Sequence, residues 1–171
     1  MDSPNWLDPE NARPITASIL EALARLDPTG RPRWEQNRTG FLTDLDARLL
    51  RWSDATAPYK GTRVIVVHET WPYFAQRFGL DVVAAVEPNP GVPPSASHLA
   101  SLIQHMKDTR VRLLLAGPES DTAVVDQVAA RSGARAVTLI PSVGGDPAAR
   151  DYLSLFDVNV KRLTEALAAS R

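Results

Sequence analysis

Hydrophobic residues follow two different spacings along the chain, and the spacing changes near residue 57. Before that point they recur every three or four residues, which is typical of amphipathic helices. Asp8 and Pro9 suit the start of a helix, and the segment Asp27–Gly30 suits its end. The pattern therefore predicts one helix from about residue 9 to 26 and a longer one from about residue 32 to the mid-fifties. The apolar positions on the two helices are Ile15, Ile19, Leu20, Leu23 and Leu26, then Phe41, Leu42, Leu45, Leu49 and Trp52.

From residue 58 onwards, short apolar runs alternate with helical patterns. The runs at residues 63–67, 82–86, 111–115 and 136–140 are predicted to be strands, and the first of them contains the β-branched residues Val64–Val67, which is typical of a strand buried on both faces. Strands that alternate with helices form parallel sheets with helices on both faces. The predicted fold is therefore α/β, with a four-stranded parallel sheet flanked by helices and preceded by two long helices. We divide it into an N-terminal segment with the two helices, residues 1–57, and an α/β lobe, residues 58–171.

The composition excludes several classes of protein. The 171 residues are 44% apolar and carry a net charge of −1, which gives no basic surface for nucleic acid. The chain has no cysteine, so disulfides and thiolate metal sites are excluded. No apolar run approaches the length of a membrane span, and the N-terminus shows no secretory signal. Without a basic face beside them, the four tryptophans are predicted to pack in the core.

Polar residues follow the predicted strands, at the edge where open α/β sheets bind ligands. These residues are His68 and Glu69 after the first strand, Glu87 after the second, Glu119 after the third and Ser142 after the fourth. Imidazole and carboxylate groups together suit Zn, Mn or Fe. They would equally serve general acid–base catalysis. His68 is the first candidate residue, because it ends the apolar run Val64–Val67 and therefore lies at the carboxyl end of a strand.

Structural explanations for the same residues stay open. His68 also fits a polar residue at a strand end that bonds to a loop carbonyl. Glu119 precedes a helix, where capping is the default role of a carboxylate, and Glu87 lies in a Pro-rich loop. His98 and His105 are seven residues apart on one predicted helix, about 10 Å, which is too far to hold one ion together. No phosphate-binding glycine loop and no nucleophile elbow follows any strand.

Several ordered motifs resemble the zinc- and manganese-type solute-binding proteins of ABC importers. One motif is similar to the segment that opens the long helix in that family. A second resembles the family's strand, histidine and aromatic helix, and a third resembles its Pro-rich loop. Two features of the last helix also fit, and the resemblance runs over nearly the whole chain. The matching segments are 5–12 (Asn-Trp-Leu-Asp-Pro-Glu-Asn-Ala), 66–80, 87–91 with 94–95, and 151–153 with Asn159.

The resemblance implies one lobe of a two-lobed binding protein, in which a Zn or Mn ion lies between lobes joined by a long helix. It implies a metal-transport role rather than an enzyme, a periplasmic or extracytoplasmic location, and the membrane permease of an ABC importer as a partner. A further implied partner is an amino-terminal lobe that these 171 residues do not include. We expect the face around His68, which would meet that lobe, to be exposed and partly apolar.

The resemblance also assigns the candidate ligands. His68 carries over as a metal ligand and Glu87 as the loop carboxylate. Glu69, Ser142 and Glu119 are expected to line the pocket or orient the imidazole. Three other positions that are acidic or histidine in the family hold different residues here. Those residues are Pro4, Gly117 and Pro141.

Three functions remain open from the sequence. The first is a Zn- or Mn-binding lobe, which we expect to bind metal only weakly in isolation, because zinc sites use about four ligands. The second is a degenerate lobe that acts as an interaction domain, with a homodimer through the exposed lobe face. The third, which the sequence favours least, is a small α/β hydrolase in which His68 is the general base and Glu87 or Glu119 its partner.

Overall fold

A parallel sheet of four strands forms the centre of the lobe. The computed structural model describes residues 4–89 and 92–170, so residues 1–3 of the predicted N-terminal segment and Pro90 and Gly91 of the Pro-rich loop lie outside it. Neighbouring strands are all parallel, in the order β2-β1-β3-β4. The predicted fold class is confirmed. The strands are β1 (Thr62–Val66), β2 (Leu80–Ala85), β3 (Leu113–Ala116) and β4 (Arg135–Thr138).

The observed strand limits differ from the predicted ones where a helix end intervenes. β2 begins at Leu80, two residues early, because Gly79 at φ 72° turns the chain directly from the preceding helix into the sheet. β3 begins at Leu113, two residues late. The reason is that Val111 still belongs to a helix end: its N–H donates to the Met106 carbonyl at 2.9 Å, after Arg110 at φ 55°. Apolar content alone does not distinguish such helix ends from strands.

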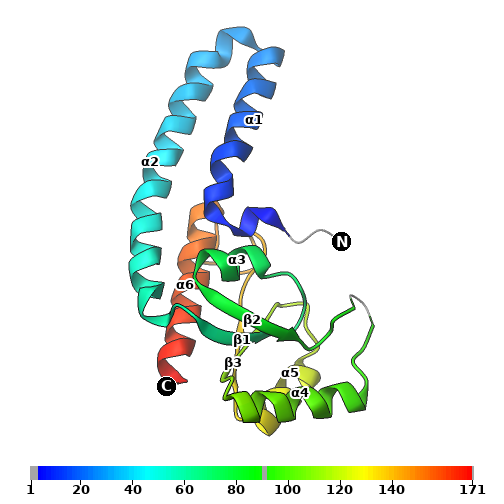
Figure 1. The fold of residues 1–171 in the computed structure, drawn as a ribbon. Helices are drawn as coiled ribbons and strands as arrows, with labels where there is room; N and C mark the ends of the chain where they lie inside the picture. The colour runs from blue at the N-terminus through cyan, green and yellow to red at the C-terminus, as the bar shows by residue number, and fades with distance from the viewer. Residues whose placement is uncertain (1–3, 90–91, 171) are drawn as a thin grey trace.

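Helices cover both faces of the sheet (Figure 1). Side chains alternate along β1, so Val64 and Val66 pack with α2, α3 and α6, whereas Ile65 and Val67 pack with α4 and α5. The sheet is therefore buried on both sides, as the β-branched strand sequences predict. The α-helices among the described residues are α1 (Ala12–Leu26), α2 (Arg31–Thr56), α3 (Pro72–Arg77), α4 (Ala96–Thr109), α5 (Thr122–Ser132) and α6 (Tyr152–Ala169).

The C-terminal half of α2 is fixed to the lobe through α6. The indole N–H of Trp52 donates to the Asp157 carboxylate at 2.9 Å, and Arg48 pairs with the same carboxylate. The Trp52 ring also packs on Phe156, with ring centroids 5.3 Å apart. One helix thus belongs both to the lobe core and to the segment that extends beyond it.

The N-terminal half of α2 pairs with α1 as a helical hairpin that extends away from the sheet (Figure 1). Asp27 closes the hairpin turn by accepting a hydrogen bond from the Gly30 N–H at 3.1 Å. The predicted apolar stripe of α1 is only partly covered: Ile19 is 52% and Leu26 is 84% exposed. Across the described residues, these long helices included, no helix is both long and apolar enough to cross a membrane.

Candidate functional site

The strand order places His68 at the centre of the carboxyl edge of the sheet. His68 follows β1, and β1 lies between β2 and β3. Strand-like hydrogen bonds continue to this edge, because the Val67 N–H donates to Leu115 O at 2.8 Å and the Glu87 N–H donates to Val67 O at 2.9 Å. The backbone itself therefore brings Glu87 beside His68. We call this part of the edge, formed by His68, Glu87 and Glu119, the histidine rim.

His68 and Glu87 are in direct contact. The His68 Nε2 atom lies 2.9 Å from a carboxylate oxygen of Glu87. Both side chains are largely buried, with exposed fractions of 22% and 12%. A side-chain nitrogen and a carboxylate oxygen at this separation, at the mouth of a parallel sheet, are a pair of donor atoms to which a divalent cation can bind.

Glu119 lies on the other side of the same imidazole. Its Oε1 atom is 3.5 Å from His68 Nδ1, which is longer than a good hydrogen bond. The Nδ1 atom is buried and has no hydrogen-bond partner among the described residues. Glu119 does not cap α5, because Asp121 accepts the hydrogen bond from the Ala123 N–H at 2.8 Å. Capping, the default explanation for Glu119, is therefore wrong.

Ser142 and Glu69, the other predicted pocket residues, are placed differently. Ser142 follows β4, which is separated from β1 by β3, and its carbonyl oxygen accepts a hydrogen bond from the Gly145 N–H at 3.3 Å. Glu69 is exposed in the turn between β1 and α3. Their roles around a metal ion stay predictions.

At the β4 end of the same edge, side chains form hydrogen bonds to the backbone. The buried amide of Asn159 on α6 accepts from the Ile140 N–H and donates to the Ile140 carbonyl, both at 2.8 Å. The indole N–H of Trp6 donates to the Pro141 carbonyl at 3.1 Å. The sequence interpretation assigned no role to Asn159 beyond the family motif. A polar amide on the otherwise apolar stripe of α6 is the sequence feature that could have indicated a buried hydrogen-bonding role for Asn159.

Trp6 corrects the prediction that all four tryptophans are core residues. It is 44% exposed beside Pro141, whereas Trp52 and Trp71 are buried. The Tyr152 hydroxyl donates to the Trp6 carbonyl at 2.8 Å and so fixes the N-terminal segment against α6. Burial, together with the Asp8 carboxylate, raises the pKa of Tyr152, so its hydroxyl stays protonated and remains a donor.

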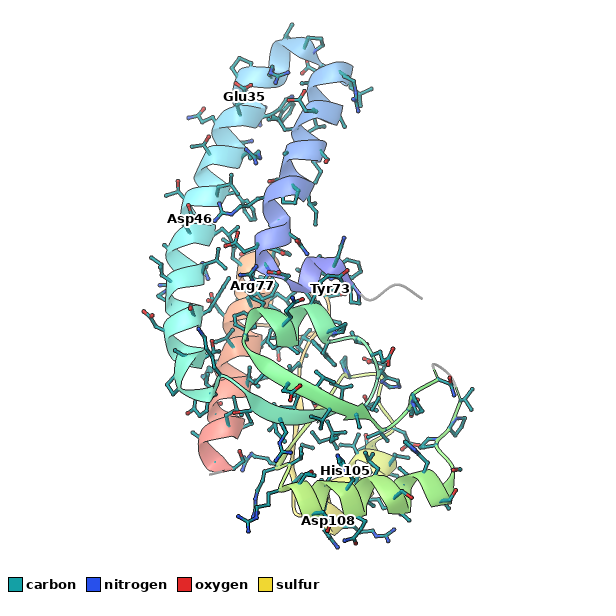
Figure 2. All side chains as sticks on the ribbon, in the orientation of Figure 1. Glu35, Asp46, Tyr73, Arg77, His105 and Asp108 are labelled. Carbon is teal, nitrogen blue, oxygen red and sulfur yellow. The ribbon has the colours of Figure 1, made fainter. Side chains whose placement is uncertain are left out.

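The other two histidines lie on a single helix, α4, as predicted. His98, on α4, donates its Nε2–H to the Ala85 carbonyl at 3.2 Å. His105 is exposed on the same helix, on the opposite side of the lobe from Tyr73 and Arg77 of α3 (Figure 2). The Arg77 Nε–H donates to the Asp8 carboxylate at 2.6 Å, and this hydrogen bond raises the pKa of the guanidinium.

The donor set of the histidine rim is small. Within residues 4–89 and 92–170, no group of three or more histidine, aspartate and glutamate side chains is arranged to hold a metal ion. His68 Nε2 and Glu87 supply two donor atoms on one side of the ring, and Glu119 faces the other ring nitrogen. An open α/β lobe with an imidazole–carboxylate pair at its carboxyl edge belongs to the class of ligand-binding lobes.

Comparison with known proteins identifies the family. A model of the ZnuA family, the periplasmic component A of zinc-uptake complexes, matches residues 1–166. The high-affinity zinc uptake system protein ZnuA of Brucella abortus is 26% identical over 136 residues, which cover 80% of this chain and 41% of the relative. The chain therefore belongs to the ZnuA family. Because this family consists of metal-uptake components, the prediction that the chain is not an enzyme is confirmed.

Solved structures give the same result. The crystal structure of ZnuA matches with a TM-score of 0.79 at 27% identity, over 94% of this chain and 58% of that one. FpvC from Pseudomonas aeruginosa, in complex with Mn²⁺, matches with a TM-score of 0.72 at 26% identity, over 90% and 58%. The chain spans about half the length of the curated relatives it matches, 41% and 51% for two of them. Zinc and manganese both occur among the metals that these relatives' names and complexes record.

Proposed function

We propose that this chain is the metal-binding lobe of a solute-binding protein that serves an ABC importer, and that Zn or Mn is its cargo. His68 would bind the ion through Nε2 and Glu87 through its carboxylate. The observation that carries this proposal is the 2.9 Å contact between His68 Nε2 and Glu87 at the carboxyl edge of the sheet. Membership in the ZnuA family supports a metal as the cargo.

Two donors predict weak binding by this chain alone. Zinc sites in proteins use about four ligands, so His68 and Glu87 amount to half of a site. The remaining ligands would come from protein outside these 171 residues, since the curated relatives are about twice as long as the matched region. Weak binding by one lobe would allow release of the ion when the two lobes separate.

The surface around the histidine rim and along the hairpin supports a second lobe as the partner. Trp6 lies in the N-terminal segment and is 44% exposed. Val92 and Val143 lie in the loops after β2 and β4 and are 56% and 48% exposed. Between α1 and α2 lies an apolar groove of about 340 Å³, lined by Ile19, Leu20, Leu23, Trp34 and Phe41 among others. Exposed apolar surface of this kind marks interfaces. The same family assignment supports a periplasmic location and a membrane permease as the second partner.

The test is calorimetric titration of the chain with Zn²⁺ and Mn²⁺, in parallel with His68→Ala and His105→Ala. We expect a dissociation constant weaker than about 1 μM, because a two-ligand site lacks half of the usual donors. Binding should disappear in His68→Ala and persist in His105→Ala, which removes an imidazole far from the rim. Equal binding by the wild type and His68→Ala would contradict the proposal, and a one-to-one site tighter than micromolar would contradict a half-site.

The second candidate is an interaction domain that forms a homodimer. The exposure of Leu26, together with Ile19 and Leu23 on the same face of α1, favours it. Light scattering would then give twice the chain mass of 18.7 kDa, and Leu26→Ser with Ile19→Ser would restore the monomer. A wild-type monomer would argue against this candidate.

A further inference from the structure

The turn after β3 contains a buried glycine whose backbone does not require glycine. Gly117 is not among the residues with positive φ, unlike Gly61, Gly79, Gly133 and Gly144. A Cβ atom at position 117 would instead lie 2.2 and 2.3 Å from the two carboxylate oxygens of Glu119. Space, rather than backbone conformation, explains the glycine: the Glu119 carboxylate occupies the volume that a side chain at 117 would fill.

Two hydrogen bonds hold this turn in place. The Ser120 N–H donates to the Gly117 carbonyl at 3.1 Å, and the Gly117 N–H donates to the Ser120 hydroxyl at 3.1 Å. They close the chain between residues 117 and 120 and fold Glu119 back over Gly117. Asp121 caps α5, so the Glu119 carboxylate is left to face the histidine rim.

That carboxylate faces the Nδ1 atom of the His68 ring. His68 Nδ1 is buried and has no hydrogen-bond partner in the part of the chain that the structure describes, and Glu119 Oε1 lies 3.5 Å away. Glu119 is 48% exposed, so its side chain has room to close the remaining gap. A metal-binding histidine almost always donates its second ring N–H to a carboxylate or carbonyl, which fixes the tautomer and the ring orientation.

We propose that Gly117 and Glu119 act together to position His68. Glu119 accepts the Nδ1–H of His68 and so leaves the Nε2 lone pair for the metal beside Glu87, while Gly117 keeps open the space that Glu119 needs. Glu119 is thus a positioning residue, and Gly117 acts through it. The inference deepens the proposed metal-binding function and rests on it for its effect on affinity, but the His68 contact itself exists without metal.

Gly117→Ala is the most informative variant. The atoms that a new Cβ would meet are the end of a flexible side chain, so Glu119 can swing away with little loss of stability. The matched control is Gly40→Ala on α2, where a Cβ would meet nothing within 4 Å. Glu119→Ala and the double variant Gly117→Ala/Glu119→Ala complete a cycle, because a glycine that acts through Glu119 has no effect once that carboxylate is gone.

Two readouts are needed. The first is the ¹⁵N and ¹H spectrum of the His68 ring without metal, and the second is the Zn²⁺ dissociation constant by competition with a chromophoric chelator. We expect Gly117→Ala and Glu119→Ala each to shift the His68 Nδ1 resonance but not those of His98 and His105, and to weaken zinc about tenfold. The double variant should match Glu119→Ala, and Gly40→Ala should match the wild type.

The outcomes separate this inference from the proposed function. A His68 spectrum that is unchanged in Gly117→Ala and Glu119→Ala would overturn the inference, even if the wild type binds zinc. Additive losses in the double variant would overturn the action of Gly117 through Glu119. If the wild type binds no zinc but the His68 resonance moves as expected, the proposed function fails and the positioning of His68 stands.

Discussion

The two ends of the sheet's carboxyl edge differ in how their polar side chains are used. At the histidine rim, after β2, β1 and β3, two carboxylates lie next to one imidazole, whose Nδ1 atom has no hydrogen-bond partner among residues 4–89 and 92–170. At the β4 end, the Asn159 amide and the Trp6 indole saturate the backbone of Ile140 and Pro141. The side chains of the first arrangement can bind a ligand, whereas those of Asn159 and Trp6 are already hydrogen-bonded to the backbone.

This difference follows from the strand order. β1 is flanked on both sides, so the residue that follows it gains neighbours from β2 and from β3. β4 is an edge strand, and it relies on α6 and the N-terminal segment for support. We therefore expect substitutions at the β4 end to change stability but not metal binding, and substitutions at the histidine rim to do the reverse.

The largest effect on stability should come from Asn159→Ala. It leaves the buried N–H and carbonyl of Ile140 without partners, and each unsatisfied buried group costs about 1–3 kcal/mol. We expect a loss of about 3 kcal/mol in the free energy of unfolding, measured by urea denaturation. Gln36→Ala, at an exposed position on α2, is the control and should stay within about 0.5 kcal/mol. If the folded fraction of Asn159→Ala also bound zinc more weakly than the wild type, the distinction between the two ends would be contradicted.

Glu87→Gln should show the opposite pattern. The amide keeps the shape of the side chain but removes the negative charge that attracts the cation, so zinc affinity should fall about tenfold, or about 1.4 kcal/mol. Stability should change little, as in Glu165→Gln on the far end of α6. The measurement is zinc competition at a protein concentration where both variants are folded. Undiminished affinity would remove Glu87 from the site.

Asp151→Ala should cost about 1 kcal/mol, because Asp151 caps α6, the helix that carries Asn159. Hydrogen bonds from the backbone N–H and the hydroxyl of Ser154 lower the pKa of Asp151. A lowered pKa in the folded state means that the charge contributes stability above the unfolded-state pKa of about 3.9 and that this contribution is lost as pH falls further. The stability difference between wild type and Asp151→Asn should therefore shrink below about pH 4. A difference that grows on acidification would contradict this assignment.

Trp6→Phe should have the smallest effect. It removes one partly exposed hydrogen bond to Pro141 but keeps an aromatic ring, so we expect a loss of about 0.5 kcal/mol. Thermal unfolding is the measurement, and zinc affinity serves as the internal control. A change in affinity larger than the change in stability would place Trp6 in the metal site.

Periodicity predicts the fold well here because the helices and strands differ clearly in spacing. The alternation after residue 58 indicates a parallel sheet, and the structure confirms it. The order of the strands is not encoded in that alternation, since several orders satisfy the same connection rules. That Glu87 and Glu119 flank His68, while Ser142 lies beyond β3, could be learned only from the structure.

The role of Gly117 shows a second limit of the sequence. Sequence inspection shows a glycine after a strand, which is ordinary in a turn. Its purpose depends on where the Glu119 side chain folds, and this is a property of the closed turn between residues 117 and 120. The partial exposure of α1 has a similar cause: the helical stripe predicts an apolar face, but not how much protein packs against it.

Zinc titration followed at the ring nitrogens of the three histidines tests the central claim most directly. If the histidine rim supplies half of a metal site, Zn²⁺ should move the His68 Nε2 resonance while those of His98 and His105 stay in place. Movement at His98 or His105 in preference to His68, or no movement at any ring at millimolar zinc, would contradict the account.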